Sequence, residues 1–427
     1  MRKENFKKGA ASMYVVVIAA LLFGVITVSF IRLIVSESLR TTNSELAQSA
    51  YDSALAGVED AKTALKKYYS NLSACSTPSD APTTSTNECE HIKYYIENAL
   101  NGTLTINDDG EKCSTISNAL QRNGSSPSTD EVLIKQTTDG DSNTEQAYTC
   151  VTINNQLSDY KATLSSSVPT FVVPLKYANP TTTTITGIKF SWFSAEDGDI
   201  AFGSDVKEDY RFNNNYTTPP EVSIQLIQTS ATFDFSSFDA SDGSQTNRGT
   251  IFLDPNGGSG TSFANHTNYI ASSGFVKSNS HTQSNEAYSI RCESGQDFAC
   301  SVIAQLPDPI GGGRNPDTFF LVVTLPYGDP TTHFSVQMCT NDSASLQNGD
   351  CTPATFDGVQ TAVDSTGRAN DMFSRVEARI ELSDIYFPYA EFALQLSGDG
   401  TPLNKNFYVT KNCWADSDGC NNSGEAK

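Results

Sequence analysis

The first pattern along the chain is an apolar stretch near its N-terminus. From Ala10 to Ile31 the sequence has 22 residues, and its only polar members are two serines and a threonine. A helix of this length spans roughly 33 Å, which is enough to cross the hydrocarbon core of a bilayer. A cleaved secretion signal has a shorter apolar core followed by a small-x-small site. Here Arg32 follows directly, so the stretch is predicted to be retained as an anchor.

Positive charge precedes the apolar stretch. The leader of residues 1–9 contains four basic side chains, those of Arg2, Lys3, Lys7 and Lys8. Under the positive-inside rule these residues stay in the cytoplasm. The sequence therefore predicts a single-pass membrane protein that contacts lipid through residues 10–31 and has its bulk outside the cell.

Apolar residues recur at helical spacing after the stretch. Between Ser36 and Leu72 there is no proline and one glycine, Gly57. The apolar positions, three or four residues apart, are Leu39, Leu46, Ala50, Ala54, Val58, Ala61, Leu65, Tyr68, Tyr69 and Leu72. This spacing predicts one continuous helix over residues 10–72, on the order of 90 Å long. Its second half is expected to pack on the rest of the chain and its first half on neighbouring copies.

Short strands replace the helical pattern further along the chain. Residues 73–160 are predicted to form a small disulfide-stapled α+β region, with a loop at 73–90, a helix at His91–Gly102, and strands at Thr103–Ile106, Glu131–Lys135 and Ala147–Ile153. Residues 161–427 contain ten β-branched and aromatic runs split by turn residues, which favours a β-sandwich-like domain. The predicted class is α+β: a long N-terminal helix and a mainly antiparallel β head. Trp192 and Trp414 are expected in its core or beside its disulfides.

Charge and composition narrow the compartment and the partners. The chain has 28 Lys and Arg against 49 Asp and Glu, a net charge of -21. This balance argues against a nucleic-acid partner. Serine, threonine and asparagine are abundant after residue 70, a composition that suits an extracellular β-rich protein better than an acidic cytosolic enzyme.

All ten cysteines follow the apolar stretch. An even number in an exported chain indicates disulfides in an oxidising space. We expect pairing between sequence neighbours: Cys75 with Cys89, Cys113 with Cys150, Cys292 with Cys300, Cys339 with Cys351, and Cys413 with Cys420. The alternative, a zinc site, requires closely spaced ligand pairs such as CxxC, and the sequence has none.

No motif for catalysis or for a cofactor occurs in the sequence. GxSxG, HExxH and GxxxxGK[ST] are absent, and Gly311–Arg314 lacks the lysine and helix that follow a phosphate-binding loop. The acidic turns Asp239–Gln245 and Ala415–Asn422 could bind calcium, but they lack the terminal glutamate of the twelve-residue loop, which favours solvated turns. The prediction is a protein that is not an enzyme, with no catalytic residue, cofactor or metal.

The N-terminal segment resembles type IV pilins and pseudopilins. The features that carry the resemblance are the basic leader ending in Lys8-Gly9, the small residues Ala10 and Ala11, and the alanine-rich run Glu45–Leu65. The likeness is greatest to the PilX-type minor pilins, whose alanine-rich run ends in a stretch similar to the GVEDA of residues 57–61. It implies that a prepilin peptidase cuts between Gly9 and Ala10, that Ala10 becomes a methylated N-terminus, and that the helix enters a filament core.

One position departs from the pattern of the shaft-forming pilins. Those proteins carry glutamate at the fifth mature residue, where it compensates the buried N-terminal amine, and the corresponding residue here is Tyr14. An amine buried without a carboxylate is costly. In the resembling families some minor and tip subunits lack this glutamate. Tyr14 therefore favours a minor or tip subunit, or else a chain that is not processed.

Residues and resemblance together predict a minor or tip subunit of a type IV pilus-like filament, with a structural role in assembly or surface adhesion. The expected partners are membrane lipid, prepilin peptidase, other pilins along the helix, and a cell-surface or carbohydrate ligand of the head. The main alternative is a permanently anchored surface adhesin or receptor that never enters a filament. A secreted hydrolase with an unrecognised site is a further alternative.

Overall fold

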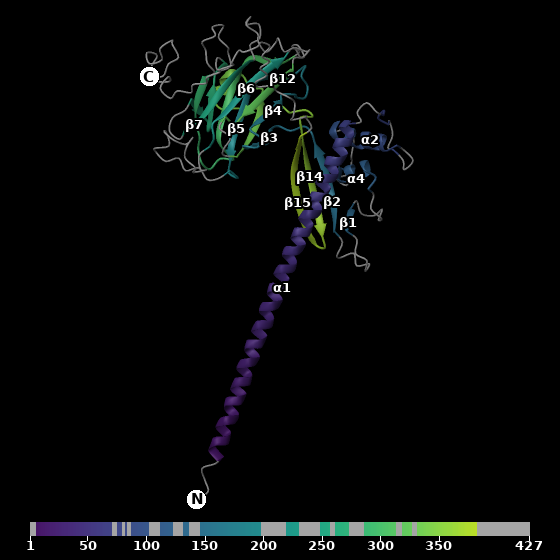
Figure 1. Cartoon of the computed structure of the whole chain (residues 1–427), viewed down its shortest axis with the longest axis vertical. Helices are drawn as coiled ribbons and strands as arrows, with labels where there is room; N and C mark the ends of the chain where they lie inside the picture. Colours follow the sequence, from purple (N-terminus) through teal and green to yellow (C-terminus); the bar gives the residue numbers. More distant parts are fainter. Residues whose placement is uncertain are drawn as a thin grey trace, which may run out of the picture. The chain divides into compact units, whose positions relative to one another are not determined.

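The computed structural model describes residues 6–70, 75–78, 82, 87–101, 112–122, 131–135, 146–197, 219–229, 248–256, 261–272, 286–312, 318–326 and 331–381. These residues form a long N-terminal apolar helix followed by three mainly antiparallel sheets (Figure 1). The predicted combination of a long helix with a disulfide-containing, mainly antiparallel β part is confirmed.

Helix α1 spans Phe6–Ser70, 65 residues without a break. Its second half has one buried face, formed by residues three or four positions apart: Ala50, Ser53, Ala54, Gly57, Val58, Asp60, Ala61, Ala64, Leu65 and Tyr68. The predicted stripe is therefore found from Ala50 onward. Leu39, which was assigned to the same stripe, is 60% exposed, because no described part of the chain covers that turn.

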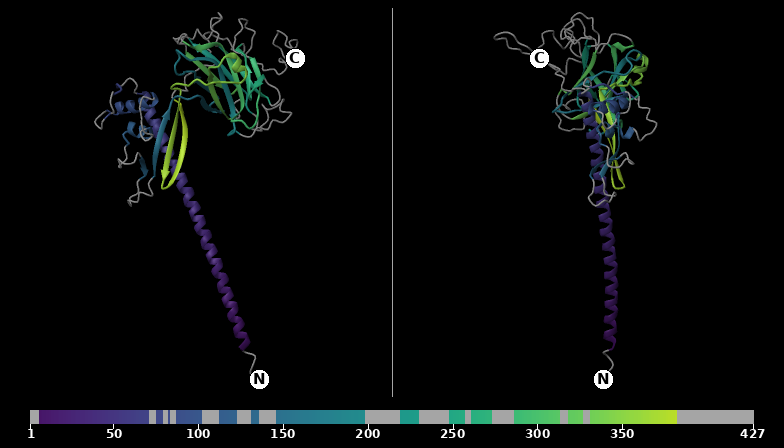
Figure 2. Two further views of the ribbon diagram at one scale, coloured as in Figure 1. Left: turned by 180° about the vertical axis from the view of Figure 1, so that it is seen from behind. Right: turned by 90° about the vertical axis from the view of Figure 1, so that its right-hand side faces the viewer.

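A four-stranded antiparallel sheet packs against this face of α1. Its order is β1 (Val132–Lys135), β2 (Gln146–Asn154), β14 (Gln360–Ala369) and β15 (Met372–Glu381). Helix α1 lies against β2, β14 and β15, as both views in Figure 2 show. Two short helices, α2 (Glu88–Asn101) and α4 (Thr115–Ala119), complete the core between the helix and the sheet.

Two glycines allow the helix and the sheet to approach closely. A Cβ atom on Gly367 of β14 would lie 2.2 Å from the carbonyl oxygen of Ala50 and 2.2 Å from the amide nitrogen of Ala54. A Cβ on Gly57 would lie 2.3 Å from the hydroxyl oxygen of Ser365 and 2.7 Å from a methyl carbon of Val151. Backbone therefore meets backbone here, a contact that any larger residue at position 367 would prevent.

The remaining strands form a β-sandwich. One sheet has the order β10-β7-β6-β12-β4 and the other β3-β13-β5-β11-β9-β8. Their bounds are β3 (Tyr160–Leu164), β4 (Thr170–Pro174), β5 (Thr184–Ser194), β6 (Val222–Thr229), β7 (Arg248–Asn256), β8 (Ser262–Ala264), β9 (Thr267–Ile270), β10 (Glu286–Arg291), β11 (Phe298–Gly311), β12 (Thr318–Thr324) and β13 (Thr332–Cys339). A short helix, α5 (Ser343–Gln347), follows β13.

Both sheets of the sandwich contribute to one apolar core. Ile188, Phe190 and Val302 come from the six-stranded sheet, and Leu226 and Leu321 come from the five-stranded sheet. Trp192 is fully buried in this core, as predicted, and its indole N–H donates to the carbonyl oxygen of Pro220 over 3.0 Å. Trp414 lies outside the described residues.

The sandwich is inserted between two neighbouring strands of the four-stranded sheet. Strands β14 and β15 fall within residues 161–427, which were predicted to form the sandwich. Instead, β14 pairs with β2, and the pairing begins with Ala362 opposite Asn154. The predicted domain boundary at residue 160 therefore does not separate the sheets, because pairing in an antiparallel sheet need not follow sequence proximity.

Strands β3, β8, β9, β10 and β14 were not predicted. The predicted strands at 103–106, 391–396 and 406–414 lie outside the described residues.

Polar contacts join the start of the sandwich to the end of β15. The Tyr160 hydroxyl donates to Glu381 over 2.6 Å, and Arg379 donates to the carbonyl and the carboxylate of Asp159, over 2.9 and 3.0 Å. Burial raises the pKa of Tyr160 far above its ordinary value and also raises the pKa of Glu381. Tyr160 therefore remains a hydrogen-bond donor to this carboxylate at neutral pH.

Replacing Gly367 with alanine should destabilise the contact between helix and sheet. A methyl group 2.2 Å from backbone atoms forces a shift of the strand or the helix, so we expect a loss of about 1–3 kcal/mol in the free energy of unfolding. Urea unfolding measures the loss, and hydrogen exchange of residues 50–65 locates it. Gly24→Ala is the control, because a Cβ there meets nothing within 4 Å. Equal stability of the two variants would contradict the close contact.

Candidate functional site

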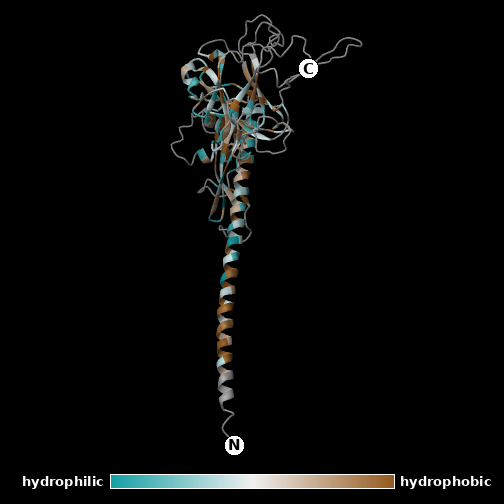
Figure 3. Cartoon of the chain, turned by 90° about the vertical axis from the view of Figure 1, so that its left-hand side faces the viewer, coloured by the Kyte–Doolittle hydropathy of each residue, from teal (hydrophilic) through white to brown (hydrophobic). Residues whose placement is uncertain are grey.

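The first half of α1 exposes apolar side chains on all its faces. Met13, Tyr14 and Phe23 are 73%, 72% and 71% exposed, and large apolar residues remain exposed as far as Leu39. In Figure 3 successive turns of this part of the helix are coloured brown, which marks hydrophobic residues. A helix that is apolar all round is not a surface helix of a water-soluble domain. Such a helix is typical of a membrane span or of a helix buried among other polypeptides.

Two hydroxyl side chains within the apolar stretch are satisfied by the backbone of the helix itself. The Thr27 hydroxyl donates to the carbonyl oxygen of Phe23, and the Ser29 hydroxyl donates to that of Val25, each over 2.8 Å. A hydroxyl that is hydrogen-bonded within the helix does not require water or a partner chain. These two residues therefore enter an apolar environment at little cost.

By length and composition, α1 is long and apolar enough to cross a membrane. The residues proposed for processing, Lys8, Gly9 and Ala10, lie within the helix, and their side chains are outside the described part of the structure. The side chain of Tyr14 is described and is largely exposed, and among the described residues no hydrogen bond or ion pair involves it. Between Glu4 and Glu37 the sequence contains no carboxylate.

A buried carboxylate fixes the second half of α1 to the sheet. Asp60, whose side chain is 11% exposed, accepts a hydrogen bond from the Tyr148 hydroxyl of β2 over 2.8 Å and pairs with Arg122 at 3.1 Å. Burial and the neighbouring Asp60 raise the pKa of Tyr148 well above its ordinary value. The tyrosine therefore stays a donor, and the aspartate sets the rotation of the helix relative to β2.

The end of α1 is tied to α2 by a salt bridge and a disulfide. Lys67 pairs with Glu88, and Cys75 is bonded to Cys89 in the first turn of α2. The Lys93 ammonium donates to the carbonyl oxygen of Cys75 over 2.6 Å. These contacts restrain the segment that follows the helix, so that α2 stays against the buried face of α1.

Four of the five expected cysteine pairs are disulfides in the structure. They are Cys75–Cys89, Cys113–Cys150, Cys292–Cys300 and Cys339–Cys351, and no described cysteine is free. The fifth pair, Cys413 and Cys420, lies outside the described residues. Cys113–Cys150 attaches the segment before α4 to β2, and the other two disulfides lie in the sandwich.

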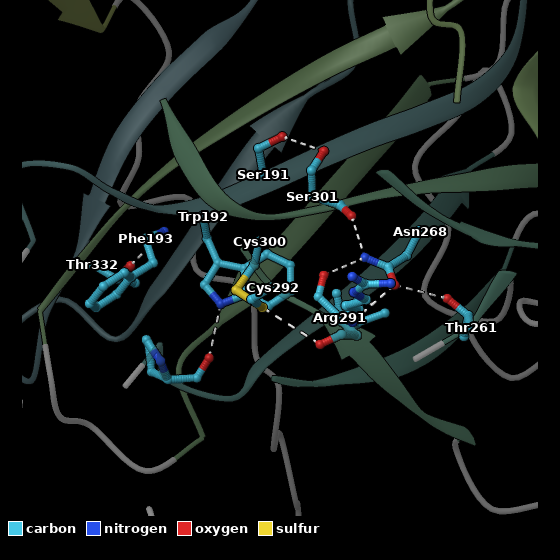
Figure 4. Close-up of a disulfide and its surroundings, with 12 residues drawn as sticks. Ser191, Trp192, Phe193, Thr261, Asn268, Arg291, Cys292, Cys300, Ser301 and Thr332 are labelled. Carbon is cyan, nitrogen blue, oxygen red and sulfur yellow. Dashed lines mark hydrogen bonds between the residues drawn. A yellow bond between two sulfur atoms is a disulfide. The ribbon is translucent and has the colours of Figure 1, made fainter. Parts of the chain in front are cut away.

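The Cys292–Cys300 disulfide connects the two sheets of the sandwich. Cys292 directly follows β10 of one sheet, and Cys300 lies on β11 of the other, in register with Trp192 of β5 (Figure 4). Beside it the fully buried Asn268 donates to the carbonyl oxygens of Arg291 and Ser301, over 2.8 and 2.9 Å, and accepts from the amide of Arg291. The amide side chain thus satisfies backbone groups where β9, β10 and β11 meet.

The sandwich also contains an aspartate–histidine pair, and its hydrogen bonds hold two strands together. Asp197 accepts hydrogen bonds from the amides of Ser194 and His333, over 2.8 and 2.9 Å, and from Nδ1 of His333 at 2.6 Å. Nε2 of His333 faces Glu196 at 3.8 Å rather than a serine or threonine hydroxyl. The pair therefore joins the end of β5 to the start of β13. In the described part of the chain no three His, Cys, Asp or Glu side chains gather as a metal site would require.

Comparison with protein-family models, with curated proteins and with solved structures gave no match to this chain. Sequence pattern located the apolar half of α1 and the cysteine pairs. It did not locate Asp60 or Gly367. The roles of this aspartate in the helix and this glycine in the strand are apparent only when the helix and the sheet are packed together.

Peptide mapping without reduction checks the cysteine pairing over the whole chain. We expect five crosslinked pairs between sequence neighbours, including Cys413–Cys420. The largest described loop, between Cys113 and Cys150, spans 37 residues, and closing a loop of this length stabilises a fold by about 3–4 kcal/mol in the chain-entropy model. Crosslinks between other partners, or free thiols on most of the ten cysteines, would contradict both the pairing and an oxidising compartment.

Proposed function

We propose that this protein is a minor or tip subunit of a type IV pilus-like filament. The observation that carries the proposal is the division of α1: its first half is apolar and exposed on all faces, and its second half is packed on an antiparallel sheet by small residues. A subunit that first resides in a membrane and then packs through the same helix into a filament needs this division. The resemblance of residues 1–65 to the pilin pattern supports the same assignment.

The role proposed is structural. The helix supplies contacts to lipid before assembly and to other subunits afterwards, while the sheet and the sandwich remain accessible for interaction at the surface. Burying an all-round apolar helix among others of its kind is favourable at roughly 25 cal/mol per Å² of apolar surface. The second candidate, a permanently anchored adhesin or receptor, requires only the membrane step and is favoured by the missing carboxylate at Tyr14.

A minor or tip position is favoured over a shaft position for two reasons. The first is Tyr14, which cannot neutralise an N-terminal amine buried in a filament core. The second is size, because more than 300 residues follow α1 and would crowd a closely spaced helical array. A subunit present in few copies need not pack its amine beside an identical neighbour, and its large head does not crowd other copies.

Processing at Gly9 distinguishes the filament subunit from the permanent anchor. We expect chain sheared from the cell surface to begin Ala10-Ala11-Ser12, and Gly9→Leu to leave a full-length protein in the membrane. Intact-mass measurement of sheared and membrane-bound fractions gives both answers. Gly24→Ala is the control, since it changes a glycine of the same helix outside the cleavage site. Sheared material that retains Met1 would exclude the processed subunit.

Copy number tests the minor position. We expect quantitative mass spectrometry of purified filaments to find this chain at low abundance relative to a shaft pilin that carries a carboxylate near its N-terminus. Tyr14→Glu should be tolerated, because the residue is exposed along the helix and a glutamate there could pair with the amine. If this chain is the most abundant pilin in the filament, the argument from Tyr14 is wrong.

A further inference from the structure

We propose that an open cavity at one end of the sandwich binds a neutral carbohydrate. The cavity has a volume of about 530 Å³, within the range of ligand-binding pockets. Three segments line it: residues 178–184, which lead from β4 into β5; Thr340, directly after β13; and residues 353–355. The proposal goes beyond the filament role, and it stands or falls independently of it.

The chemistry of the lining selects the class of ligand. Five threonines and one asparagine provide the polar groups, Ala178, Ala354 and Pro353 provide apolar surface, and the lining contains no charged or aromatic side chain. A divalent cation needs carboxylates, and an anion has no counter-charge here in a chain of net charge -21. A purely apolar ligand would desolvate hydroxyls without pairing them. A neutral polyol fits, because each of its hydroxyls both donates and accepts, as threonine does.

Several of these polar groups have unused hydrogen-bonding capacity. The hydroxyls of Thr182 and Thr340 donate to the carbonyl oxygens of Asn179 and Thr352, over 3.4 and 3.1 Å. Among the described residues, the side chains of Thr183, Thr184 and Thr355 have no hydrogen-bond partner. Three threonine hydroxyls on two of the lining segments are thus not committed to partners within the described part of the chain.

The walls are held in place before any ligand arrives. The amide of Ala178 donates to Thr355 over 2.9 Å, that of Thr183 to Asn179 over 2.9 Å, and that of Thr340 to Thr352 over 3.0 Å, in each case to the carbonyl oxygen. The Cys339–Cys351 disulfide closes the loop that begins at Thr340 and ends two residues before Pro353. A preformed site loses less conformational entropy on binding, which matters for weakly binding sugars.

The test is saturation-transfer NMR on the full-length chain in detergent. The probes are the methyl glycosides of glucose, galactose, mannose and N-acetylglucosamine, with the methyl glycoside of N-acetylneuraminic acid as an acidic probe. We expect at least one neutral probe to bind. The triple variant Thr183→Val, Thr184→Val and Thr355→Val removes the free hydroxyls at nearly constant shape and should weaken that binding about tenfold or more.

Controls separate loss of the site from loss of the fold. Thr163→Val changes a threonine of β3 outside the cavity and should leave binding unchanged. Thr182→Arg places a bulky group at the exposed rim, so it should block binding even if the triple variant does not fold. Binding of no neutral probe, binding of the acidic probe alone, or neutral binding that survives Thr182→Arg would each overturn the proposal. None of these outcomes bears on whether the chain enters a filament.

Discussion

The structure depends on the direct contact between the backbone of α1 and the backbone of β14. Gly367 leaves room for the turn of α1 that contains Ala50 and Ala54, and Gly57 leaves room for Ser365 and Val151. Because these side chains are absent or small, the helix and the sheet approach closely enough for Asp60 to meet Tyr148. The remaining core residues of α1, α2 and the sheet then close around this contact. The exposed first half of α1 therefore extends from a second half whose position and rotation are fixed relative to the four-stranded sheet.

The place of the sandwich in the chain follows from the same sheet. Strands β2 and β14 are adjacent and in register from Asn154 opposite Ala362, so the chain leaves and re-enters the sheet at one point. An insertion with adjacent ends adds a domain without altering the strand order around it. The central pair of the four-stranded sheet forms only between segments separated by the whole sandwich. Folding of the four-stranded sheet therefore depends on a long-range contact between β2 and β14. This contact is slow to form compared with the local pairing of β14 and β15.

The features that sequence predicted are those set by local pattern. The buried face of α1 follows from three- and four-residue spacing, and strands such as β5 and β12 follow from β-branched and aromatic runs. Strand β14 escaped prediction because its sequence, QTAVDSTGRA, contains the serine and glycine that α1 requires beside it. Tertiary packing overrode local propensity at that strand. The cavity was not predicted for a different reason: its threonines come from three segments that only the fold brings together.

The absence of acidic residues between Ala10 and Ser36 determines what a filament containing this chain must provide. If the chain is cut after Gly9, the amine of Ala10 lies 27 residues before Glu37, the next carboxylate in the sequence. At 1.5 Å per residue that is about 40 Å along a helix, far beyond the reach of a salt bridge. In a bilayer the amine can remain at the polar interface. In a filament core it must be neutralised by a glutamate on another subunit or remain at an end that is open to water. The helix thus needs no partner carboxylate in a membrane, whereas in a filament it would need either a carboxylate from a different subunit or a position at an open end.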